Sequence, residues 1–313
     1  MATELELIER VRRRAGAPRS NGLVIGIGDD CAIFRPRGTY DLLFTTDLLI
    51  EGTHFLRTTH TAEEVGWKTL ARGLSDIAAM GGEPRFCLIS LSIAVWQNER
   101  WIVGFYRGLL RLSKRESTPL AGGDLAHGDR AMCDIVVCGA VSRGKALRRD
   151  GARAGDRLYV SGALGGSALG LTKGKRDLAA WSRHARPLPR LALGRFIRER
   201  LEATAAMDLS DGLSLDLRRL CLASGLRAEI APPPRFRGAT LHQALHGGED
   251  YELLFAVRPG THVPAKFEGV ALTEIGVLGK GRPGDVSMNG EPLAALGYDH
   301  LVNSRRATLN SDD

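Results

Sequence analysis

The stretch "TAEEVGWKTLARGLSDIAAMGG" (61–82) spaces its apolar residues as an amphipathic helix does. Thr61 is the expected N-cap, and Glu64, three residues later, is its expected capping-box partner. The flanking stretches "DLLFTTDLLI" (41–50) and "FCLISLSIAV" (86–95) are apolar and extended, and they predict strands. Strands that alternate with helices indicate an α/β or α+β protein.

The same alternation continues to both sides. It predicts an N-terminal surface helix, a helix at 98–115 with a strand at 132–141 after it, and then a strand at 156–162, helices at 189–201 and 211–225, and a strand at 251–257. A chain of 313 residues usually forms two domains, and the Gly-rich basic stretch 142–162 marks a boundary near residue 145. We therefore expect domains at 1–145 and 146–303, followed by a disordered tail at 304–313. Residues 172–190 form either a flexible surface loop or a helix.

Composition excludes several classes of protein. No apolar run approaches the ~20 residues that span a bilayer, and the N-terminus lacks the apolar core of a signal peptide, so we expect a cytoplasmic protein. The five cysteines are scattered without a CxxC pair, which favours reduced, buried thiols. The net charge of +7 gathers in clusters without interleaved aromatic residues, so a solvated basic face is favoured over a nucleic-acid surface.

Six short segments place carboxylates beside Gly, Ser or Thr: "GIGDD" (26–30), "TTD" (45–47), "LSD" (74–76), "GGD" (122–124), "MDLSDG" (207–212) and "GGED" (247–250). One such Asp is normally a turn former or a helix cap. Six of them at expected ends of strands and helices indicate a shared function, because loops on a rigid scaffold carry functional groups.

Asp and Thr oxygens are hard ligands that suit Mg²⁺, which binds through a few carboxylates, waters and substrate phosphates. Gly122 and Gly123 would let backbone N–H groups approach an anion, and a basic side chain of the boundary segment could reach a phosphate. A nucleotide is the natural candidate ligand. The sequence has no GxxxxGK[ST], and the glycines of "GALGGSALG" (162–170) do not follow a strand in the dinucleotide-binding pattern. GxSxG and HExxH are absent as well.

The order of these segments resembles that of a known family. "GIGDDCAIF", "TTDLLIEGTHF", "GWKTLARGLSDIAAMGG", "GGDLAHG", "RDGARAGDRLYVSG", "AMDLSDGLSLDL", "GGEDYELLF" and "GYDH" resemble, in that order, the signature segments of the thiamine-monophosphate kinases. The resemblance implies ATP- and Mg²⁺-dependent phosphorylation of thiamine phosphate to thiamine diphosphate. It also implies a two-domain aminoimidazole ribonucleotide synthetase-like fold with mixed sheets, a homodimer formed through the N-terminal domains, and a site between domains.

The resemblance carries over residue by residue. Positions that would bind several Mg²⁺ ions are Asp30, Thr45, Thr46, Asp47, Asp76, Asp124, Asp208 and Asp211. Positions on ATP are Tyr106, Gly123, Asp124, Arg149 and Ser210. Positions near thiamine phosphate are His54, Glu249 and Tyr298. Asp29 is expected to support Asp30 or to form a turn, and Asp216 and Asp250 are expected to be structural.

The expected chemistry needs no general base, because a phosphate monoester has its second pKa near ~6 and its acceptor oxygen is already ionised at neutral pH. We therefore expect direct in-line transfer. Two positions depart from the family pattern: Gly73 stands where Asn is typical, and Asp150 where Ser is typical. The alternatives are a related ATP-dependent enzyme with another substrate and a noncatalytic partner-binding protein.

Overall fold

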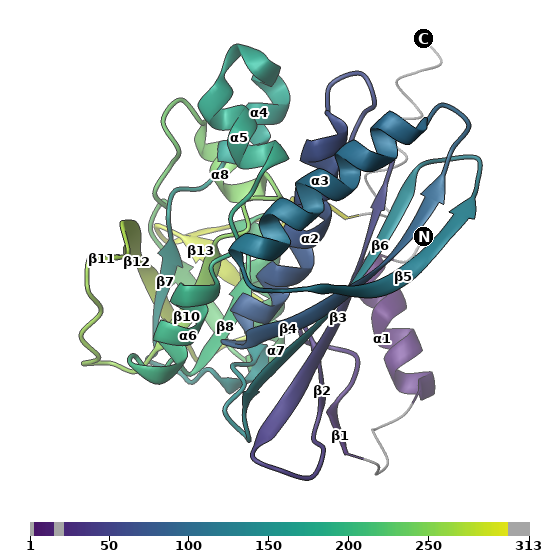
Figure 1. Cartoon of the computed structure of the whole chain (residues 1–313). Helices are drawn as coiled ribbons and strands as arrows, with labels where there is room; N and C mark the ends of the chain where they lie inside the picture. Colours follow the sequence, from purple (N-terminus) through teal and green to yellow (C-terminus); the bar gives the residue numbers. More distant parts are fainter. Residues whose placement is uncertain (1–2, 16–21, 300–313) are drawn as a thin grey trace.

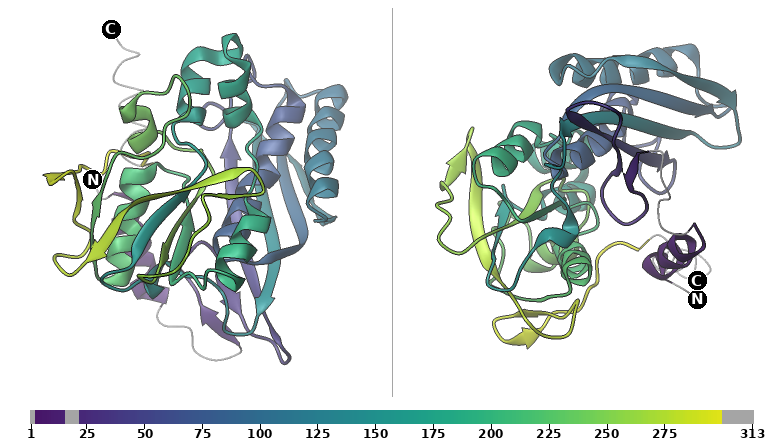
Figure 2. Two further views of the ribbon diagram at one scale, coloured as in Figure 1. Left: turned by 90° about the vertical axis from the view of Figure 1, so that its left-hand side faces the viewer. Right: turned by 90° about the horizontal axis from the view of Figure 1, so that it is seen from below.

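The computed structural model describes residues 3–15 and 22–299, and the expected tail 304–313 lies outside them. Each half of the chain builds its own sheet, and Figures 1 and 2 show the two halves side by side. No helix in the described ranges is long and apolar enough to cross a membrane. The expected mixed α/β class is confirmed, because each sheet contains both parallel and antiparallel pairs.

The first half carries a six-stranded sheet with the order β1-β2-β3-β6-β4-β5. Its elements are α1 (Glu4–Ala15), β1 (Leu23–Ile25), β2 (Ala32–Phe34), β3 (Tyr40–Ile50), α2 (Ala62–Ala79), β4 (Glu83–Ile93), α3 (Glu99–Arg115), β5 (Leu120–His127) and β6 (Met132–Ser142). Helices α2 and α3 pack against each other, and α2 also packs on the strands of this sheet (Figure 1).

The second half carries the order β14-β13-β9-β12-β7-β10-β8, with β11 beside β12. Its elements are η1 (Arg149–Gly151), β7 (Arg157–Ser161), α4 (Gly166–Lys173), η2 (Gly174–Arg176), α5 (Leu178–Ala185), α6 (Leu191–Glu199), β8 (Ala205–Asp208), α7 (Leu213–Ser224), β9 (Arg227–Ile230), α8 (Leu241–His246), β10 (Leu253–Val257), β11 (Lys266–Phe267), β12 (Val270–Gly279), β13 (Val286–Met288) and β14 (Glu291–Pro292). The boundary expected near residue 145 falls between the last strand of the first sheet and the first strand of the second.

Helix α2 is the central element of the molecule. The capping box is present as expected, since the Glu64 N–H donates to Thr61 Oγ1 and the Thr61 N–H donates to Glu64 Oε2. One side of the helix packs on β3 and β6, and the other contacts α6 and β8 of the second half. A helix that is covered all round must be apolar almost all round, so the few polar residues of α2 must find partners inside the protein.

Residues 172–190, for which the sequence allowed either a flexible surface loop or a helix, contain helix α5. Asp177 caps it by accepting a hydrogen bond from the Ala180 N–H. Trp181 is only 5% exposed, and its Nε1–H donates to Glu64 Oε1 at 2.9 Å. The helix therefore attaches the second half to the start of α2. All five cysteines are buried and free, as expected.

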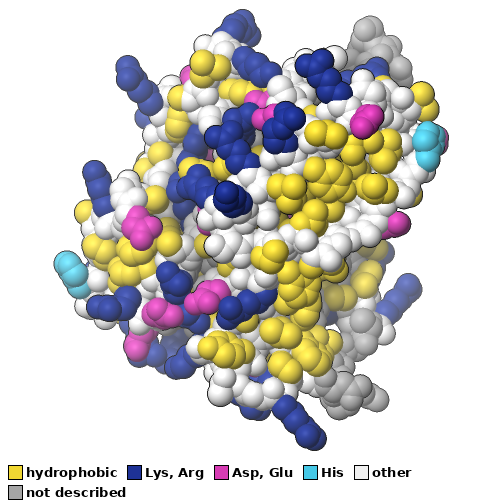
Figure 3. Space-filling view, viewed as in Figure 1, with side chains coloured by type: hydrophobic (Ala, Val, Ile, Leu, Met, Phe, Trp, Pro, Cys, Tyr) yellow, Lys and Arg dark blue, Asp and Glu magenta, His cyan; other side chains and the backbone are white. Residues whose placement is uncertain are grey.

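The basic residues form no single patch on the face shown in Figure 3. Lys and Arg side chains lie scattered there among apolar and acidic ones. Many of the arginines in the described ranges also pair with carboxylates, such as Arg35 with Asp41 and Arg149 with Asp30.

Candidate active site

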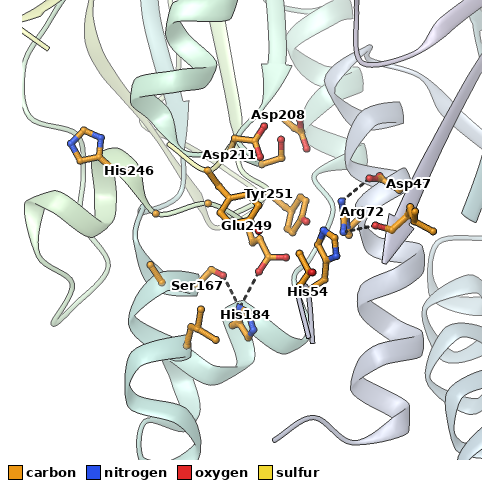
Figure 4. Close-up of a pocket in the computed structure, with 18 of the residues that line it drawn as sticks. Asp47, His54, Arg72, Ser167, His184, Asp208, Asp211, His246, Glu249 and Tyr251 are labelled. Carbon is orange, nitrogen blue, oxygen red and sulfur yellow. Dashed lines mark hydrogen bonds and ion pairs between the residues drawn. The ribbon is translucent and has the colours of Figure 1, made fainter. Parts of the chain in front are cut away.

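A cleft of about 720 Å³ opens between the two halves (Figure 4). From the first half it is lined by Asp47, His54, Arg72 and Asp76, and from the second by Ser167, His184, Asp208, Ser210, Asp211, His246, Glu249, Tyr251 and Tyr298. Eight of the expected site residues are among these. The cleft that gathers them lies between the two halves.

Three carboxylates converge beside this cleft. Asp30 follows β1, Asp76 lies near the end of α2, and Asp208 ends β8, and one oxygen from each lies within 4.8 Å of the others. Burial and the neighbouring carboxylates raise the pKa of Asp76 and of Asp208 well above the usual range. Like charges this close are costly to ionise together. The donor set fits Mg²⁺, which would relieve that repulsion.

Arg149 is the cation nearest this carboxylate trio. Its Nη2 lies 2.6 Å from Asp30 Oδ1 and its Nε 3.2 Å from Asp30 Oδ2, which gives a bidentate pair. Asp29 accepts hydrogen bonds from the backbone N–H groups of Asp30 and Arg149. Asp29 therefore supports the position of both residues, in line with its expected role. Burial, with the Asp30 charge, raises the pKa of Asp29 to about 7.

Strand β3 sends its three expected ligands to opposite faces of the sheet. Thr45 faces α2 and donates a hydrogen bond to Asp76 Oδ2. Asp47 faces the same way and accepts from Arg72 Nη2 at 2.8 Å. Thr46 points to the outer face of the sheet, where it donates to Asp134 at 2.7 Å. In the single chain, Thr45 and Asp47 are thus close to the trio, whereas Thr46 is on the other side of the sheet.

The "GGD" segment needs a correction. It was expected in a loop at the end of an element, but Gly122, Gly123 and Asp124 belong to strand β5, which pairs in parallel with β4. A Cβ on Gly123 would lie 1.8 Å from the carbonyl oxygen of Ile89, so the pairing itself requires glycine. Together with Tyr106, these residues line a separate hollow of about 360 Å³. Two strands separate β5 from β3, so Asp124 stands apart from the trio.

On the second half, the segment "MDLSDG" turns from β8 into α7. Asp211 pairs with Arg219, and Ser210 lines the cleft beside it. Asp216 accepts from the N–H groups of Asp211 and Gly212 and so holds this turn. Asp250 accepts from the N–H groups at the start of α4. Asp216 and Asp250 therefore hold the backbone in place, as expected of structural residues.

Glu249 lies at the opposite end of the cleft, in a left-handed backbone conformation with φ of 64°. Its Oε2 accepts from Lys68 Nζ at 2.8 Å and lies 3.3 Å from His184 Nδ1. Burial opposes ionisation, but Lys68, His184 and Arg72 lower the pKa of Glu249 to about 2. Lys68 is fully buried, and its Nζ also donates to the carbonyl oxygen of His54. Glu249 is therefore a permanent anion that is already neutralised.

The sequence reasoning missed several residues in or beside the cleft. Lys68 and Arg72 lie eight and four residues before the expected ligand Asp76 in α2, so the three share one face of this helix. That spacing of charges within an otherwise apolar helix was a signal that could have pointed to Lys68 and Arg72, although not to their partners. Ser167 and His184 had no comparable signal, because the contacts that bring them to Glu249 join distant parts of the chain.

The two departures from the family pattern lie away from the cleft. A Cβ on Gly73 would lie 2.6 Å from Val137 Cγ2, so this position packs against β6 instead of facing the carboxylates. Asp150 is exposed and pairs with Arg148, not with Arg149. Neither residue perturbs the Arg149 pair with Asp30.

Comparison with known proteins assigns the chain to a family. Residues 28–141 match the family model of the AIR synthase related protein, N-terminal domain, and residues 153–289 match that of the C-terminal domain. The thiamine-monophosphate kinase of Haemophilus influenzae is 36% identical, with 90% of this chain and 93% of that protein covered. The Escherichia coli K12 enzyme is also 36% identical, with 96% and 98% covered.

Solved structures have the same fold. AaThiL complexed with AMPPCP and TMP is similar with a TM-score of 0.84 and 32% identity, covering 95% of this chain and 97% of that one. Thiamine-monophosphate kinase from Stenotrophomonas maltophilia is similar with a TM-score of 0.75 and 35% identity, covering 92% and 96%. The chain therefore belongs to the AIR synthase related family and, within it, to the thiamine-monophosphate kinases.

Proposed function

We propose that this chain transfers a phosphoryl group from ATP to thiamine phosphate in a Mg²⁺-dependent reaction that yields thiamine diphosphate. The observation that carries the proposal is one cleft with two ends of different chemistry. At one end lie the trio Asp30, Asp76 and Asp208 with Arg149, and at the other lies the neutralised carboxylate of Glu249. The solved structure of AaThiL complexed with AMPPCP and TMP supports the same pair of substrates.

The metal end deals with charge. Two anionic substrates must approach each other, and repulsion between unit charges at 4 Å costs about 4 kcal/mol at an effective dielectric near 20. Bound Mg²⁺ supplies the neutralisation and orients the phosphates. We propose that the trio holds these ions with Thr45 and Asp47, and that Asp211 contributes from the second half. Thr46 and Asp124 remain proposed Mg²⁺ ligands, and Tyr106, Gly123 and Asp124 remain proposed contacts of ATP, although all four lie outside this cleft in a single chain.

Proton transfer needs no side chain of the protein in this reaction. The acceptor is a phosphate oxygen that is ionised at neutral pH, so the residues position and neutralise. Arg149 and Ser210 are proposed to contact ATP, and His54, Glu249 and Tyr298 to contact thiamine phosphate. We propose direct in-line transfer, which a phosphorylated enzyme found under single-turnover conditions would refute.

The proposed assembly is a homodimer formed through the N-terminal domains, acting in the cytoplasm. The outer face of the first sheet supports it, because Tyr40, Leu48 and Leu88 are 51%, 46% and 36% exposed there and no helix of the described ranges covers them. Exposed apolar groups on one sheet face are typical of an interface between subunits.

The test is ADP release by the purified protein with ATP and Mg²⁺, with and without thiamine phosphate, together with identification of the product. We expect ADP formation that depends on thiamine phosphate and produces thiamine diphosphate, and we expect Asp47→Asn to abolish it. A folded protein that binds MgATP without turnover would indicate an enzyme with another acceptor. Loss of nucleotide binding as well would favour a noncatalytic partner-binding protein.

A further inference from the structure

Two buried imidazole rings meet where the halves join beside the cleft. His60 ends the loop between β3 and α2, and His184 lies in α5. Their Nε2 atoms are 3.2 Å apart, and the two residues are only 6% and 2% exposed. A contact between two ring nitrogens requires that one donates and the other accepts.

The backbone decides which ring donates. The Leu56 N–H points at His60 Nδ1, with 3.3 Å between the two nitrogens, and a backbone N–H can only donate. The Thr59 hydroxyl lies 2.9 Å from the same ring nitrogen and can donate to it as well. His60 is neutral, because burial and the nearby Lys68 charge lower its pKa to about 4. Its single proton is therefore on Nε2, which donates to His184.

The same reasoning then fixes the proton on the second ring. His184 Nε2 accepts from His60, and burial with the Lys68 charge lowers the pKa of His184 to about 3, so this ring is neutral too. Its proton must be on Nδ1. That nitrogen lies 3.1 Å from Ser167 Oγ and 3.3 Å from Glu249 Oε2, and Figure 4 shows His184 between these two side chains.

The order of donors leaves hydrogen-bonding capacity on two side chains that line the cleft. Both carboxylate oxygens of Glu249 lie 2.8 Å from Lys68 Nζ, but each oxygen can accept more than one hydrogen bond, and the side chain is 24% exposed in the cleft. Ser167 Oγ can accept from His184, so its own O–H remains available to donate. The two residues thus offer one acceptor and one donor to a ligand.

We propose that His184, oriented by His60, is a positioning residue that holds Glu249 and Ser167 for a ring bearing both an amino N–H donor and a ring-nitrogen acceptor. This inference rests on the proposed function, in which the aminopyrimidine ring of thiamine phosphate is such a ring. The chain of hydrogen bonds runs from the Leu56 N–H through His60 and His184 to Ser167, and Glu249 Oε2 lies 3.3 Å from the same His184 nitrogen. Because it joins a loop of the first half to a helix of the second, it also ties substrate recognition to the arrangement of the two halves.

Steady-state kinetics test the role of His184. For His184→Leu we expect kcat/KM for thiamine phosphate to fall about 10- to 100-fold, the loss of one hydrogen bond to a charged group, mainly through KM. The KM for ATP should stay unchanged. His184→Asn keeps an amide N–H near the position of Nδ1 and should recover kcat/KM to within about threefold of the unsubstituted protein. His262→Leu, at an exposed histidine, is the control and should change nothing.

A purely structural role would give a different pattern. It would lower kcat, and with it kcat/KM for both substrates equally, leave the KM for thiamine phosphate unchanged, and not be rescued by His184→Asn. That pattern would overturn the proposal. If the unsubstituted protein itself does not turn over thiamine phosphate, the proposed function fails. The hydrogen-bond chain is then tested by the NMR spectra of the histidine rings alone.

The spectroscopic test needs no substrate and no variant. Long-range ¹H–¹⁵N correlation spectra of the full-length protein report which nitrogen of each histidine carries the proton. We expect a protonated Nε2 in His60 and a protonated Nδ1 in His184, with the exposed His262 as the internal reference. A protonated Nε2 in His184 would overturn the chain of hydrogen bonds and with it the positioning role.

Discussion

The two ends of the cleft both carry buried carboxylates, but their charges are balanced in opposite ways. At the trio Asp30, Asp76 and Asp208, burial and mutual repulsion raise the pKa of two members, and Arg149 pairs only with Asp30. At the other end, Lys68 pairs with Glu249, whose pKa falls to about 2 despite its burial.

This difference shows how one cleft can accept two unlike substrates. A carboxylate cluster with unbalanced charge attracts cations, so it suits metal ions that bring phosphates with them. A neutralised carboxylate has no need of a metal ion and offers its oxygens as hydrogen-bond acceptors. The lysine buried in α2 is therefore as informative about substrate binding as the acidic residues are about metal binding.

Asp208→Asn is the variant that breaks the metal end. We expect turnover to fall at least about 10³-fold, because a metal-binding charge is worth several kcal/mol in the transition state. In EDTA, however, the free energy of unfolding should be unchanged or should rise by about 1 kcal/mol, since one of the crowded carboxylates becomes neutral. Initial rates and urea unfolding in EDTA measure the two effects.

The matched control is Asp285→Asn, at an exposed carboxylate outside the cleft, which should change neither quantity. A large loss of stability for Asp208→Asn in EDTA would contradict the view that the trio is unbalanced without a cation. It would indicate instead that the hydrogen bond from Ser75 to Asp208, at 2.7 Å, compensates this charge in the folded protein.

Lys68→Met breaks the other end. It leaves Glu249 as a buried charge without its cation, and such losses cost about 3–5 kcal/mol of folding free energy. The double variant Lys68→Met/Glu249→Gln removes both charges and should lie within about 1 kcal/mol of the unsubstituted protein. Urea unfolding at pH 7.5 measures all three proteins.

Arg107→Met gives the control for this experiment. Arg107 of α3, with 65% of its side chain exposed, pairs with Glu63 at the start of α2, and such exposed pairs contribute at most about 1 kcal/mol. If the double variant were as unstable as Lys68→Met alone, the cost would come from lost packing around Lys68 and not from an unpaired charge.

The same two ends show how far the sequence could predict this molecule. Helix α2 was predictable because its cap and its apolar spacing are local, and the structure confirms both. The pairing of Lys68 was not, because its partner Glu249 lies 181 residues away. Strand β5 was not predicted because its Gly and Asp residues have low strand propensity, and its pairing with β4 overrides that preference.

The site shows the same limit. The sequence could propose Asp30, Asp76 and Asp208 because each lies in a recognisable short segment, and the fold does bring these three together. His184 lies in a charged stretch without any motif, and only the packing of α5 against α2 brings it to the cleft. Helix propensity and charge patterns carry no information on such long-range contacts.

Acid should change the free energy of unfolding in opposite directions at the two ends of the cleft. His60, which lies beside the Glu249 end, provides a way to measure the effect there. The folded protein holds His60 neutral down to about pH 4, whereas an unfolded chain protonates near pH 6.5. Between these values the unfolded state binds more protons, so the contribution of His60 to stability is complete above pH 6.5 and is lost as pH falls. For the raised carboxylates Asp76 and Asp208 the sign is reversed, because the folded state then binds more protons and acid relieves their repulsion.

Subtracting a His60→Gln variant isolates the histidine from these carboxylates. We expect the difference in unfolding free energy between the unsubstituted protein and His60→Gln, in EDTA, to shift by about 1.4 kcal/mol between pH 7.5 and pH 5.5, with the unsubstituted protein losing more. Gln keeps an N–H near the position of Nε2, so the packing against His184 is disturbed little. A difference that stays constant with pH would mean that His60 takes up a proton in the folded protein as readily as in the unfolded chain. The donor order from His60 to His184 would then not be fixed, and the contrast between the two ends of the cleft would rest on Lys68 alone.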